Sequence, residues 1–501
     1  MTSPVADLGS VRRLSDTLAA EWLEHHAVLP LRLEHGTLVV ATWLEVPSPL
    51  ALDELRIALG APVTLVREAE PALRSAIRRV YARDSSTAEG VIAGLAESDS
   101  GMLPGELPLD DLVHLANEAP VVRLVNLLIL EALEARASDV HLEAFTDGLR
   151  VRYRIDGVLQ PAPSPPAQLT AAIVSRLKIM ADLDLAERRL PQDGRIRLRL
   201  QDRAVDVRVA TAPTLHGESV VLRLLDRERG RRSLTDMGMG AQVLAQFTEV
   251  IGRSHGIVLV TGPTGSGKTT TLYGAIEQLR TGREKILTVE DPVEYELAGV
   301  PQVPVNEKAG VTFASALRAL LRQDPDILLV GEIRDEETAQ VATQAALTGH
   351  LVLSTLHTND AASAVTRLLD LGVAPYLVSS TVEAVLAQRL VRVLCTACRE
   401  EATPDARTLQ RVGALEQPLT TVWRAVGCPQ CRDTGYRGRQ GVFELLVMSE
   451  ALRELTHARA SGERLRACAV QEGMQPLRAD GVRLVREGVT TIDEILRVTG
   501  S

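Results

Sequence analysis

An eight-residue segment of the chain has the composition of a phosphate-binding loop. Residues 262–269 read GPTGSGKT and fit the pattern G-x-x-x-x-G-K-[ST] at every position. They follow the apolar run GIVLV and precede residues 270–279, which have helical spacing, so the motif has the strand–loop–helix context it needs. The glycines let backbone N–H groups turn toward phosphates, and the helix amino end adds partial positive charge. The segment therefore predicts a nucleotide site lined by Gly262, Pro263, Thr264, Gly265, Ser266, Gly267, Lys268 and Thr269.

Two side chains of this loop have separate expected roles. Lys268 is expected to reach the β- and γ-phosphate oxygens, and the hydroxyl of Thr269 is expected to bind Mg²⁺. A second segment, DILLVGEIRD (326–335), is an apolar strand that ends in the acidic residue Glu332. In P-loop enzymes such a carboxylate faces the γ-phosphate and orients Mg²⁺ or the attacking water. Because many strands end in a polar residue, we assign Glu332 this role only because the chain also contains the P-loop.

Further polar residues end neighbouring strands. EDPVEY (290–295) places Glu290, Asp291 and Glu294 at the edge of the sheet where ligands bind in open α/β folds, although caps and solvated loops use the same residues. His350 and His357 flank another strand, and a single histidine is more often structural than catalytic. A predicted helix over 313–326 carries two arginines four residues apart, which face either solvent or a phosphate: Arg318 and Arg322.

Four of the five cysteines form two C-x-x-C pairs separated by 29 residues: Cys395, Cys398, Cys428 and Cys431. Four thiolates suit tetrahedral Zn²⁺ and leave no position for water, so we expect a structural zinc site. A redox pair is the alternative. Cys468 is expected to be a small buried apolar residue.

The surrounding pattern indicates the elements that hold these residues. From residue 231 onward, continuously apolar strands alternate with helices, as in a parallel sheet covered on both faces, which the family resemblance given below identifies as a RecA-like α/β core. We expect this ATPase domain to span 231–501, with the zinc module at 391–440. Alternating strands at 149–159, 195–200, 205–212 and 219–225, after a helix at 121–136, predict an α+β domain over 111–230.

The beginning of the chain predicts a small mixed domain at 1–83, with helical spacing at 14–23, a strand at 37–44 and a helix at 72–81. Residues 84–110 are rich in Ser, Gly, Pro and acidic residues and read as a flexible linker. Residues 81–118 hold eight acidic residues and one arginine, which supplies most of the net charge of −10. That charge gives no reason to expect nucleic acid as a partner.

The chain contains no secretory h-region near Met1 and no uninterrupted apolar run of about 18 residues. We therefore expect a cytoplasmic protein that reaches a membrane only through partners.

Taken together, the motifs resemble those of the secretion ATPase superfamily, which includes type II secretion ATPases and type IV pilus motors. The resemblance covers residues 118–500. It rests on the P-loop, ASDVHLE (137–143), RxRxDG (152–157), QDGR (192–195), EDPVEY (290–295), LLVGEIRD (328–335), TGHLVLSTLHTN (348–359), QRL (388–390) and the four cysteines. The short N-terminal domain is most similar to that of the type II secretion ATPase. The type IV pilus assembly motor, with a nearly identical domain plan, is the alternative.

This resemblance implies roles for individual residues. Glu332 would activate the attacking water, and Arg208 and Arg223 would reach the nucleotide from the α+β domain. His357 and His350 match the functional histidines, and Arg195 lies in QDGR. Nucleotide contacts are also implied for Glu290, Asp291, Arg318 and Arg322.

The resemblance also implies a setting for the reaction. ATP, Mg²⁺ and Zn²⁺ would be bound, and the working form would be a homo-oligomer, a hexamer. The partners would be an inner-membrane docking protein, bound through the N-terminal domain, and a polytopic platform protein. A scaffold that binds nucleotide without hydrolysis is disfavoured by the intact Lys268, Thr269 and Glu332.

Overall fold

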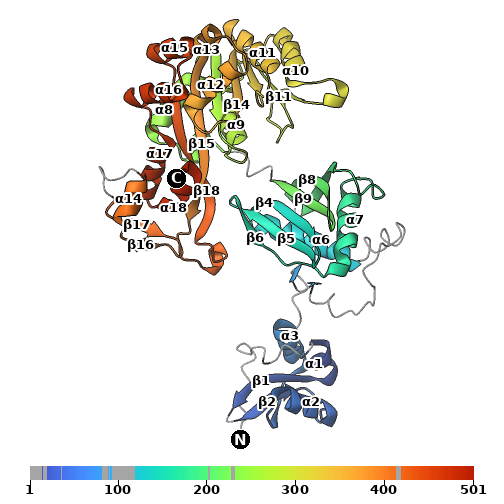
Figure 1. The fold of residues 1–501 in the computed structure, drawn as a ribbon. Coiled ribbons are helices and arrows are strands. Elements are labelled where there is room, and N and C mark those ends of the chain that lie inside the picture. The colour runs from blue at the N-terminus through green and yellow to red at the C-terminus, as the bar shows by residue number, and fades with distance from the viewer. Residues whose placement is uncertain are drawn as a thin grey trace. The chain divides into compact units, whose positions relative to one another are not determined.

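The computed structural model describes the chain at residues 14, 18, 20–34, 36–81, 88, 89, 91, 92, 119–200, 203–226, 232–412 and 419–500. The chain divides into two compact units (Figure 1). The first comprises residues 1–155, 159–200 and 207–224, and the second comprises 156–158, 201–206 and 225–501. Each is described by itself. No helix in the described ranges combines the length and apolarity that a membrane span requires.

The first unit begins with a three-stranded sheet of order β1-β2-β3. β1 and β2 are antiparallel and β2 and β3 parallel. The expected strand at 37–44 and helix at 72–81 correspond to β2 and α3, and the end of the helical spacing at 14–23 lies in α1. The linker at 84–110 falls largely outside the described residues. The elements are α1 (Ala20–His26), β1 (Val28–Glu34), β2 (Thr37–Thr42), α2 (Pro49–Leu59), β3 (Val63–Arg67) and α3 (Glu70–Tyr81).

The rest of the first unit is a six-stranded sheet of order β6-β5-β4-β9-β8-β7 with two helices. The side chains of β5 alternate between buried and more exposed, as a sheet with one apolar face requires. The elements are α6 (Ala119–Glu134), β4 (Ala137–Phe145), β5 (Gly148–Ile155), β6 (Val158–Pro161), α7 (Thr170–Met180), β7 (Gln192–Leu200), β8 (Arg203–Thr214) and β9 (Gly217–Asp226).

One expected strand of this sheet is two strands. The segment 149–159 breaks after Ile155, and Val158 begins β6 beside β5. Asp156 and Gly157 have φ values of 49° and 84°. Two successive residues with positive φ form the turn that reverses a strand most tightly, and Asp-Gly is a favoured pair for it. The alternating pattern was read correctly, but the turn within it was missed.

The second unit is built on a seven-stranded sheet of order β12-β11-β13-β14-β10-β15-β18. The expected strands at 256–262, 285–291, 326–332 and 350–357 correspond to β10, β11, β13 and β14, which pair in parallel. The predicted RecA-like α/β fold is confirmed in this sheet. Its strands are β10 (Gly256–Thr261), β11 (Ile286–Glu290), β12 (Gln302–Pro304), β13 (Ile327–Val330), β14 (Leu351–Leu356), β15 (Val382–Leu394) and β18 (Tyr436–Val447).

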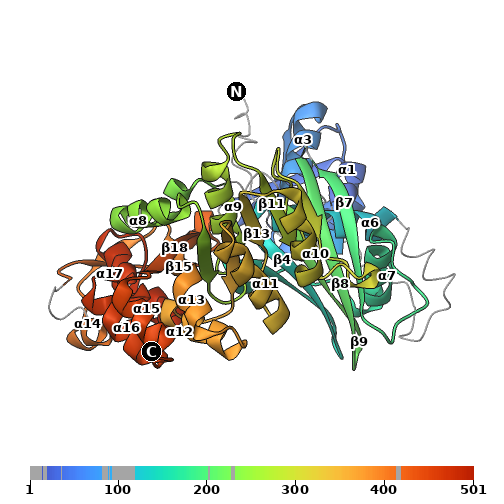
Figure 2. The same ribbon diagram turned by 90° about the horizontal axis from the view of Figure 1, so that it is seen from above.

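Apolar cores cover both faces of this sheet, and Figures 1 and 2 show the helices that enclose them. Within β10, Ile257 and Leu259 belong to one core, while Val258 and Val260 belong to the other. The first core includes α10 to α13 and α15 to α18, and the second includes α8 and α9. Successive side chains of the strand point to opposite faces of the sheet, so each strand contributes to both apolar cores.

The helices of this unit are α8 (Ala241–Ile251), α9 (Lys268–Leu279), α10 (Phe313–Leu320), α11 (Glu336–Leu347), α12 (Ala361–Asp370), α13 (Pro375–Thr381), α14 (Ala406–Val412), α15 (Glu450–His457), α16 (Gly462–Gln471), α17 (Leu477–Arg486) and α18 (Ile492–Thr499). The helix expected over 313–326 is shorter, because α10 ends at Leu320 and a 3₁₀ turn follows at 321–323. Arg322 therefore lies in the turn rather than in the helix that carries Arg318.

Two long strands were not expected. β15 lies parallel to β10 on one side and antiparallel to β18 on the other, so the parallel sheet carries an antiparallel edge. Residues 382–388 are buried without interruption, and such a run has no alternation to distinguish a strand from a buried helix. Between these strands, a small hairpin pairs β16 (Glu400–Ala402) with β17 (Val422–Arg424).

Candidate nucleotide site and metal centre

The P-loop connects β10 to α9, and its glycines adopt backbone conformations that favour glycine. Gly262, Gly265 and Gly267 have φ values of 151°, 77° and 90°. A Cβ atom on Gly262 would lie 2.6 Å from the carbonyl oxygen of Gln388 and 2.6 Å from the hydroxyl oxygen of Ser266. Other side chains are therefore excluded from this position by both strain and contact.

Polar groups of the loop lack the partners that a phosphate would provide. The ammonium of Lys268 donates to the carbonyl oxygens of Gly262 and Pro263, at 2.9 and 3.3 Å. Burial lowers the pKa of Lys268, although the nearby carboxylate of Glu332 raises it. The hydroxyl of Ser266 is buried and has no hydrogen-bond partner among the described residues. A buried hydroxyl without a partner and a cation held only by neutral oxygens both fit phosphate oxygens as the missing ligand.

Glu332 follows β13 and meets His357, which follows β14, the neighbouring strand. The Nε2 atom of His357 lies 3.1 Å from one carboxylate oxygen of Glu332, and the guanidinium of Arg334 pairs with the other. Glu332 is only 8% exposed, and its contact with Arg334 raises the pKa of that arginine. The fold thus brings Glu332, expected to activate water, together with His357, expected to be a functional histidine, and adds Arg334 as a third partner.

Arg334 was not singled out from the sequence. Its position two residues beyond the acidic end of the strand was visible in LLVGEIRD, but surface arginines after strands are common and nothing in the local pattern distinguishes this one.

Glu290 is held in a buried network at the carboxyl end of β11. It is 3% exposed and accepts hydrogen bonds from Tyr273, from Thr288 at 2.6 Å and from Gln302 at 3.0 Å. The hydroxyl of Tyr273 has a raised pKa, caused by burial and by the charge of Glu290. Such a saturated carboxylate suits an anchor for the following loop better than a nucleotide ligand. Asp291, next in the chain, is exposed.

Three other expected residues make contacts elsewhere. Arg318 forms an ion pair of 2.7 Å with Glu337, and Arg322 donates to the carbonyl oxygen of Arg318 at 3.0 Å. His350 precedes β14, and its carbonyl accepts from Gly256 at the start of β10. It therefore lies at the amino end of the sheet, opposite the P-loop, and its imidazole contacts the carbonyl of Ala345 at 2.9 Å. His350 thus lies apart from Glu332 and His357, and its functional role stays a prediction.

The two arginines of the α+β domain lie on adjacent strands of the six-stranded sheet, Arg208 on β8 and Arg223 on β9. The Nε atom of Arg223 lies 3.0 Å from Asp139, while 54% of its side chain remains exposed. Arg154 approaches the other oxygen of Asp139 at 3.8 Å. Arg208 is half-buried, and Arg195 is exposed on β7. Arg223 is thus oriented by one carboxylate and keeps surface available for a second anion.

The four paired cysteines converge on one point. Their sulfur atoms all lie within 4.8 Å of one another, with separations of 3.9 Å for Cys395–Cys428, 3.8 Å for Cys398–Cys431 and 3.7 Å for Cys428–Cys431. A tetrahedron with Zn–S bonds of about 2.3 Å has edges of about 3.8 Å. The backbone N–H groups of Gly427 and Gly435 also donate to these sulfurs. The donor set and spacing therefore fit a tetrahedral metal ion.

Comparisons with known proteins agree with this geometry. A family profile described as "Type II/IV secretion system protein" matches residues 114–497, and one described as "MshEN domain" matches residues 3–87. The type II secretion system protein HxcR of Pseudomonas aeruginosa is 49% identical over 95% of this chain and 98% of its own. The type II secretion system ATPase E of Vibrio cholerae is 47% identical over 90% of each chain.

A second group of relatives belongs to pilus systems. The type IV pilus assembly ATPase PilB of Myxococcus xanthus is 44% identical over 95% of this chain and 85% of its own. Among solved structures, the pilus retraction motor PilT with bound ADP matches with a TM-score of 0.50 and 26% identity, over 75% of this chain and 96% of PilT. The family profile covers more than half of the chain, including the P-loop, Glu332 and all four paired cysteines, so the chain belongs to the type II/IV secretion system protein family.

Proposed function

We propose that this protein is the ATPase motor of a type II secretion system, which hydrolyses ATP to assemble a pseudopilus and export folded proteins across the outer membrane. The observation that carries the proposal is the meeting of Glu332 with His357 beside an intact P-loop. Full-length similarity to type II secretion proteins, including HxcR and ATPase E, selects the pathway.

The residues of the site divide the reaction among them. Lys268 and the loop amides bind the phosphates of ATP, and the hydroxyl of Thr269 would hold Mg²⁺, which supplies charge neutralisation when bound. Glu332 accepts the proton of the attacking water, while His357 keeps the carboxylate oriented. Asp291 lies at the same edge of the sheet and would contact the nucleotide there. Arg318 and Arg322 would contact a nucleotide bound by a neighbouring subunit.

The working form we propose is a hexameric ring in which Arg208 and Arg223 act at the nucleotide. An arginine that stabilises the transferred phosphoryl group raises the rate of hydrolysis by about 10³–10⁵-fold. If closure of the α+β domain brings this arginine to the nucleotide, domain movement and ATP turnover are coupled. We expect Arg208→Ala and Arg223→Ala each to lower kcat at least tenfold, with little loss of thermal stability.

Arg154→Ala is the matched control for this prediction, because it also removes a guanidinium from Asp139. Specific activity of the wild type should rise with protein concentration as subunits assemble. A stable monomer with concentration-independent activity, together with full turnover in both arginine variants, would refute the proposal.

The four cysteines are proposed to hold one structural zinc ion. Cys395 follows β15 and Cys431 precedes β18, so a metal there fixes the ends of the two strands that pair along the edge of the sheet. Because structural zinc contributes folding free energy directly, Cys395→Ser and Cys428→Ser should both lower bound zinc from about one per chain and lower the unfolding temperature.

Cys468→Ser is the control for zinc, since Cys468 is half-buried in α16 and lies outside the cluster. It should keep the metal. Elemental analysis that finds no zinc in freshly purified, reduced protein would exclude the site.

Residues 1–83 are proposed to recruit the motor to the cytoplasmic face of the inner membrane through a docking protein, while a polytopic platform protein receives the motion. These residues contain none of the catalytic motifs, and their sheet has a core of its own. A truncated variant that begins at residue 110 should keep its ATPase fold and lose membrane association in cells. Fractionation that still finds it on the membrane would place docking in the later domains.

The alternative is the assembly ATPase of a type IV pilus, favoured by the similarity to PilB. Deleting the gene in its own organism and complementing it with wild-type or Lys268→Ala protein distinguishes the two. Loss of exoprotein secretion with pili intact supports the secretion motor. Loss of pili with secretion intact overturns it in favour of the pilus motor.

A further inference from the structure

We propose that Gln388, in the middle of β15, is a positioning residue that fixes the orientation of one peptide group of the P-loop. Its side-chain amide donates to the carbonyl oxygen of Ser266 at 2.7 Å and accepts from the hydroxyl of Thr271 at 2.8 Å. Gln388 is 2% exposed, so both contacts are made in the interior of the protein. One side chain from a different strand thus holds both the loop and the first turn of α9.

The contact with Ser266 matters because the same peptide group carries the N–H of Gly267. In a trans peptide the C=O and the following N–H point in opposite directions. When Gln388 holds the carbonyl of Ser266 on the side of β15, the N–H of Gly267 is directed away from β15. That N–H is one of the loop donors expected to face phosphate.

Glycine makes this orientation dependent on an outside contact. Gly267 has φ of 90°, and without a side chain it can also adopt other conformations at little cost. A Cβ atom on Gly267 would lie 3.1 Å from the amide nitrogen of Gln388, so the loop packs directly against this side chain. Gln388 therefore restricts the backbone conformation at Gly267, which the glycine itself does not restrict.

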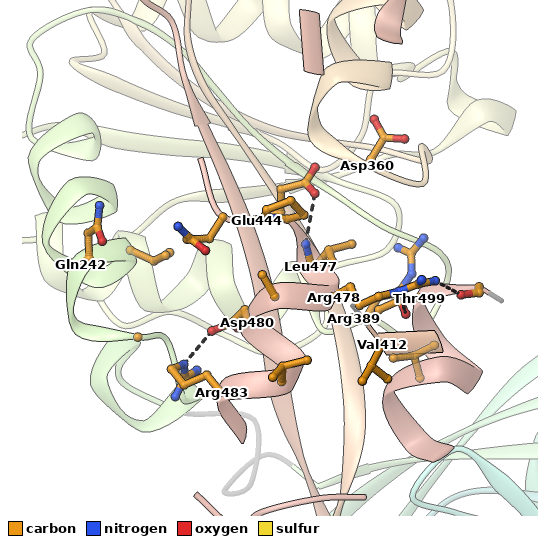
Figure 3. Close-up of a pocket in the computed structure, with 18 of the residues that line it drawn as sticks. Gln242, Asp360, Arg389, Val412, Glu444, Leu477, Arg478, Asp480, Arg483 and Thr499 are labelled. Carbon is orange, nitrogen blue, oxygen red and sulfur yellow. Dashed lines mark hydrogen bonds and ion pairs between the residues drawn. The ribbon is translucent and has the colours of Figure 1, made fainter. Parts of the chain in front are cut away.

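The neighbouring residue shows that the contact is specific to one face of β15. Arg389 turns to the other side and donates to the carbonyl and side-chain oxygens of Asn359, at 3.0 and 3.1 Å. Figure 3 shows Arg389 at the wall of a cavity of about 1170 Å³ that also includes Glu444 and Arg478. No P-loop residue lines that cavity. Arg389 thus bonds Asn359, whereas Gln388 hydrogen-bonds the P-loop and Leu390 packs beside Gly267 on the same face of the strand.

The test compares two substitutions at this position. Gln388→Met keeps the length of the side chain and removes both hydrogen bonds. Gln388→Glu keeps an acceptor for Thr271 but sets a carboxylate against the carbonyl of Ser266. We expect each to weaken ADP binding at least tenfold, measured by titration with a fluorescent ADP analogue on the full-length protein. The unfolding temperature without nucleotide should fall by only a few degrees.

Two further variants separate positioning from packing. Thr271→Val leaves the contact between Gln388 and Ser266 in place, so the dissociation constant for ADP should change by less than threefold. Thr343→Val is the matched control: Thr343 is as buried as Thr271, at 1%, but bonds the carbonyl of Ala339 within α11. It should leave ADP affinity unchanged.

A purely structural role makes the opposite prediction. It would lower the unfolding temperature of both Gln388 variants strongly while the folded fraction binds ADP with wild-type affinity, and that result would overturn the inference. So would ADP affinity within twofold of wild type in Gln388→Met. Loss of all ADP binding in Lys268→Ala together with wild-type binding in Gln388→Met would leave the ATPase proposal intact and reject this one.

Discussion

Lys268→Ala is expected to lower ATP hydrolysis by about 10³-fold or more, to the background of the assay, without unfolding the protein. In P-loop enzymes this lysine neutralises charge on oxygens of the β- and γ-phosphates, between which the P–O bond breaks. Here its ammonium is held only by two carbonyl oxygens, at 2.9 and 3.3 Å, so its loss leaves no unpaired charge behind. Phosphate release, measured with circular dichroism and thermal unfolding on the same samples, checks both parts of the prediction.

The control is Lys308→Ala, which removes an exposed lysine from the 3₁₀ turn at 307–309. It should hydrolyse ATP at the wild-type rate. Turnover by Lys268→Ala above about a tenth of the wild-type rate would contradict the assignment of Lys268 and, with it, the P-loop as the site of hydrolysis.

The parts of the site that a short segment specifies were predictable from the sequence. The P-loop is such a segment, since its glycines, its lysine and its flanking strand and helix are contiguous, and β10 and α9 appear where they were expected. Strand ends were predictable for a related reason. Parallel strands bring their carboxyl ends to one edge of the sheet, so Glu332 and His357 meet across 25 residues of sequence.

One residue to which the sequence assigned no role acts across a large separation. Gln388 contacts Ser266 over 122 positions, from a strand whose uninterrupted burial hid its structure. Gln388 and Arg334 both lie within quoted motifs, QRL and LLVGEIRD, but neither was given a role, because residue type and spacing do not show which side chain each one contacts. Glu290 ends β11 as expected, but the sequence did not show that Tyr273 and Gln302 hydrogen-bond its carboxylate, and its nucleotide contact stays a prediction.

Glu332→Gln is expected to lower kcat by about 10²–10⁴-fold while ADP and ATP still bind within a few-fold of wild type. A positioned general base contributes roughly this much to a rate, and the amide keeps the shape of the carboxylate but cannot accept the proton. Both oxygens of Glu332 have partners in the structure, Arg334 on one and His357 on the other. The substitution therefore removes two things: the general base, and the negative charge that attracts Arg334 and His357.

The two partners allow the roles to be separated. Turnover must free an oxygen of Glu332 for water, and Arg334, whose side chain is 62% exposed, is the partner with room to move. Arg334→Ala should therefore lower kcat less than Glu332→Gln does, and His357→Ala should have an intermediate effect.

The control is Glu336→Gln. Glu336 is an exposed glutamate at the start of α11 that bonds Gln340, and this variant should hydrolyse ATP at the wild-type rate. Single-turnover phosphate release resolves the order of these rates. A wild-type rate in Glu332→Gln would assign the base elsewhere, and a rate in Arg334→Ala as low as in Glu332→Gln would make Arg334 part of the chemistry instead of a partner that must withdraw.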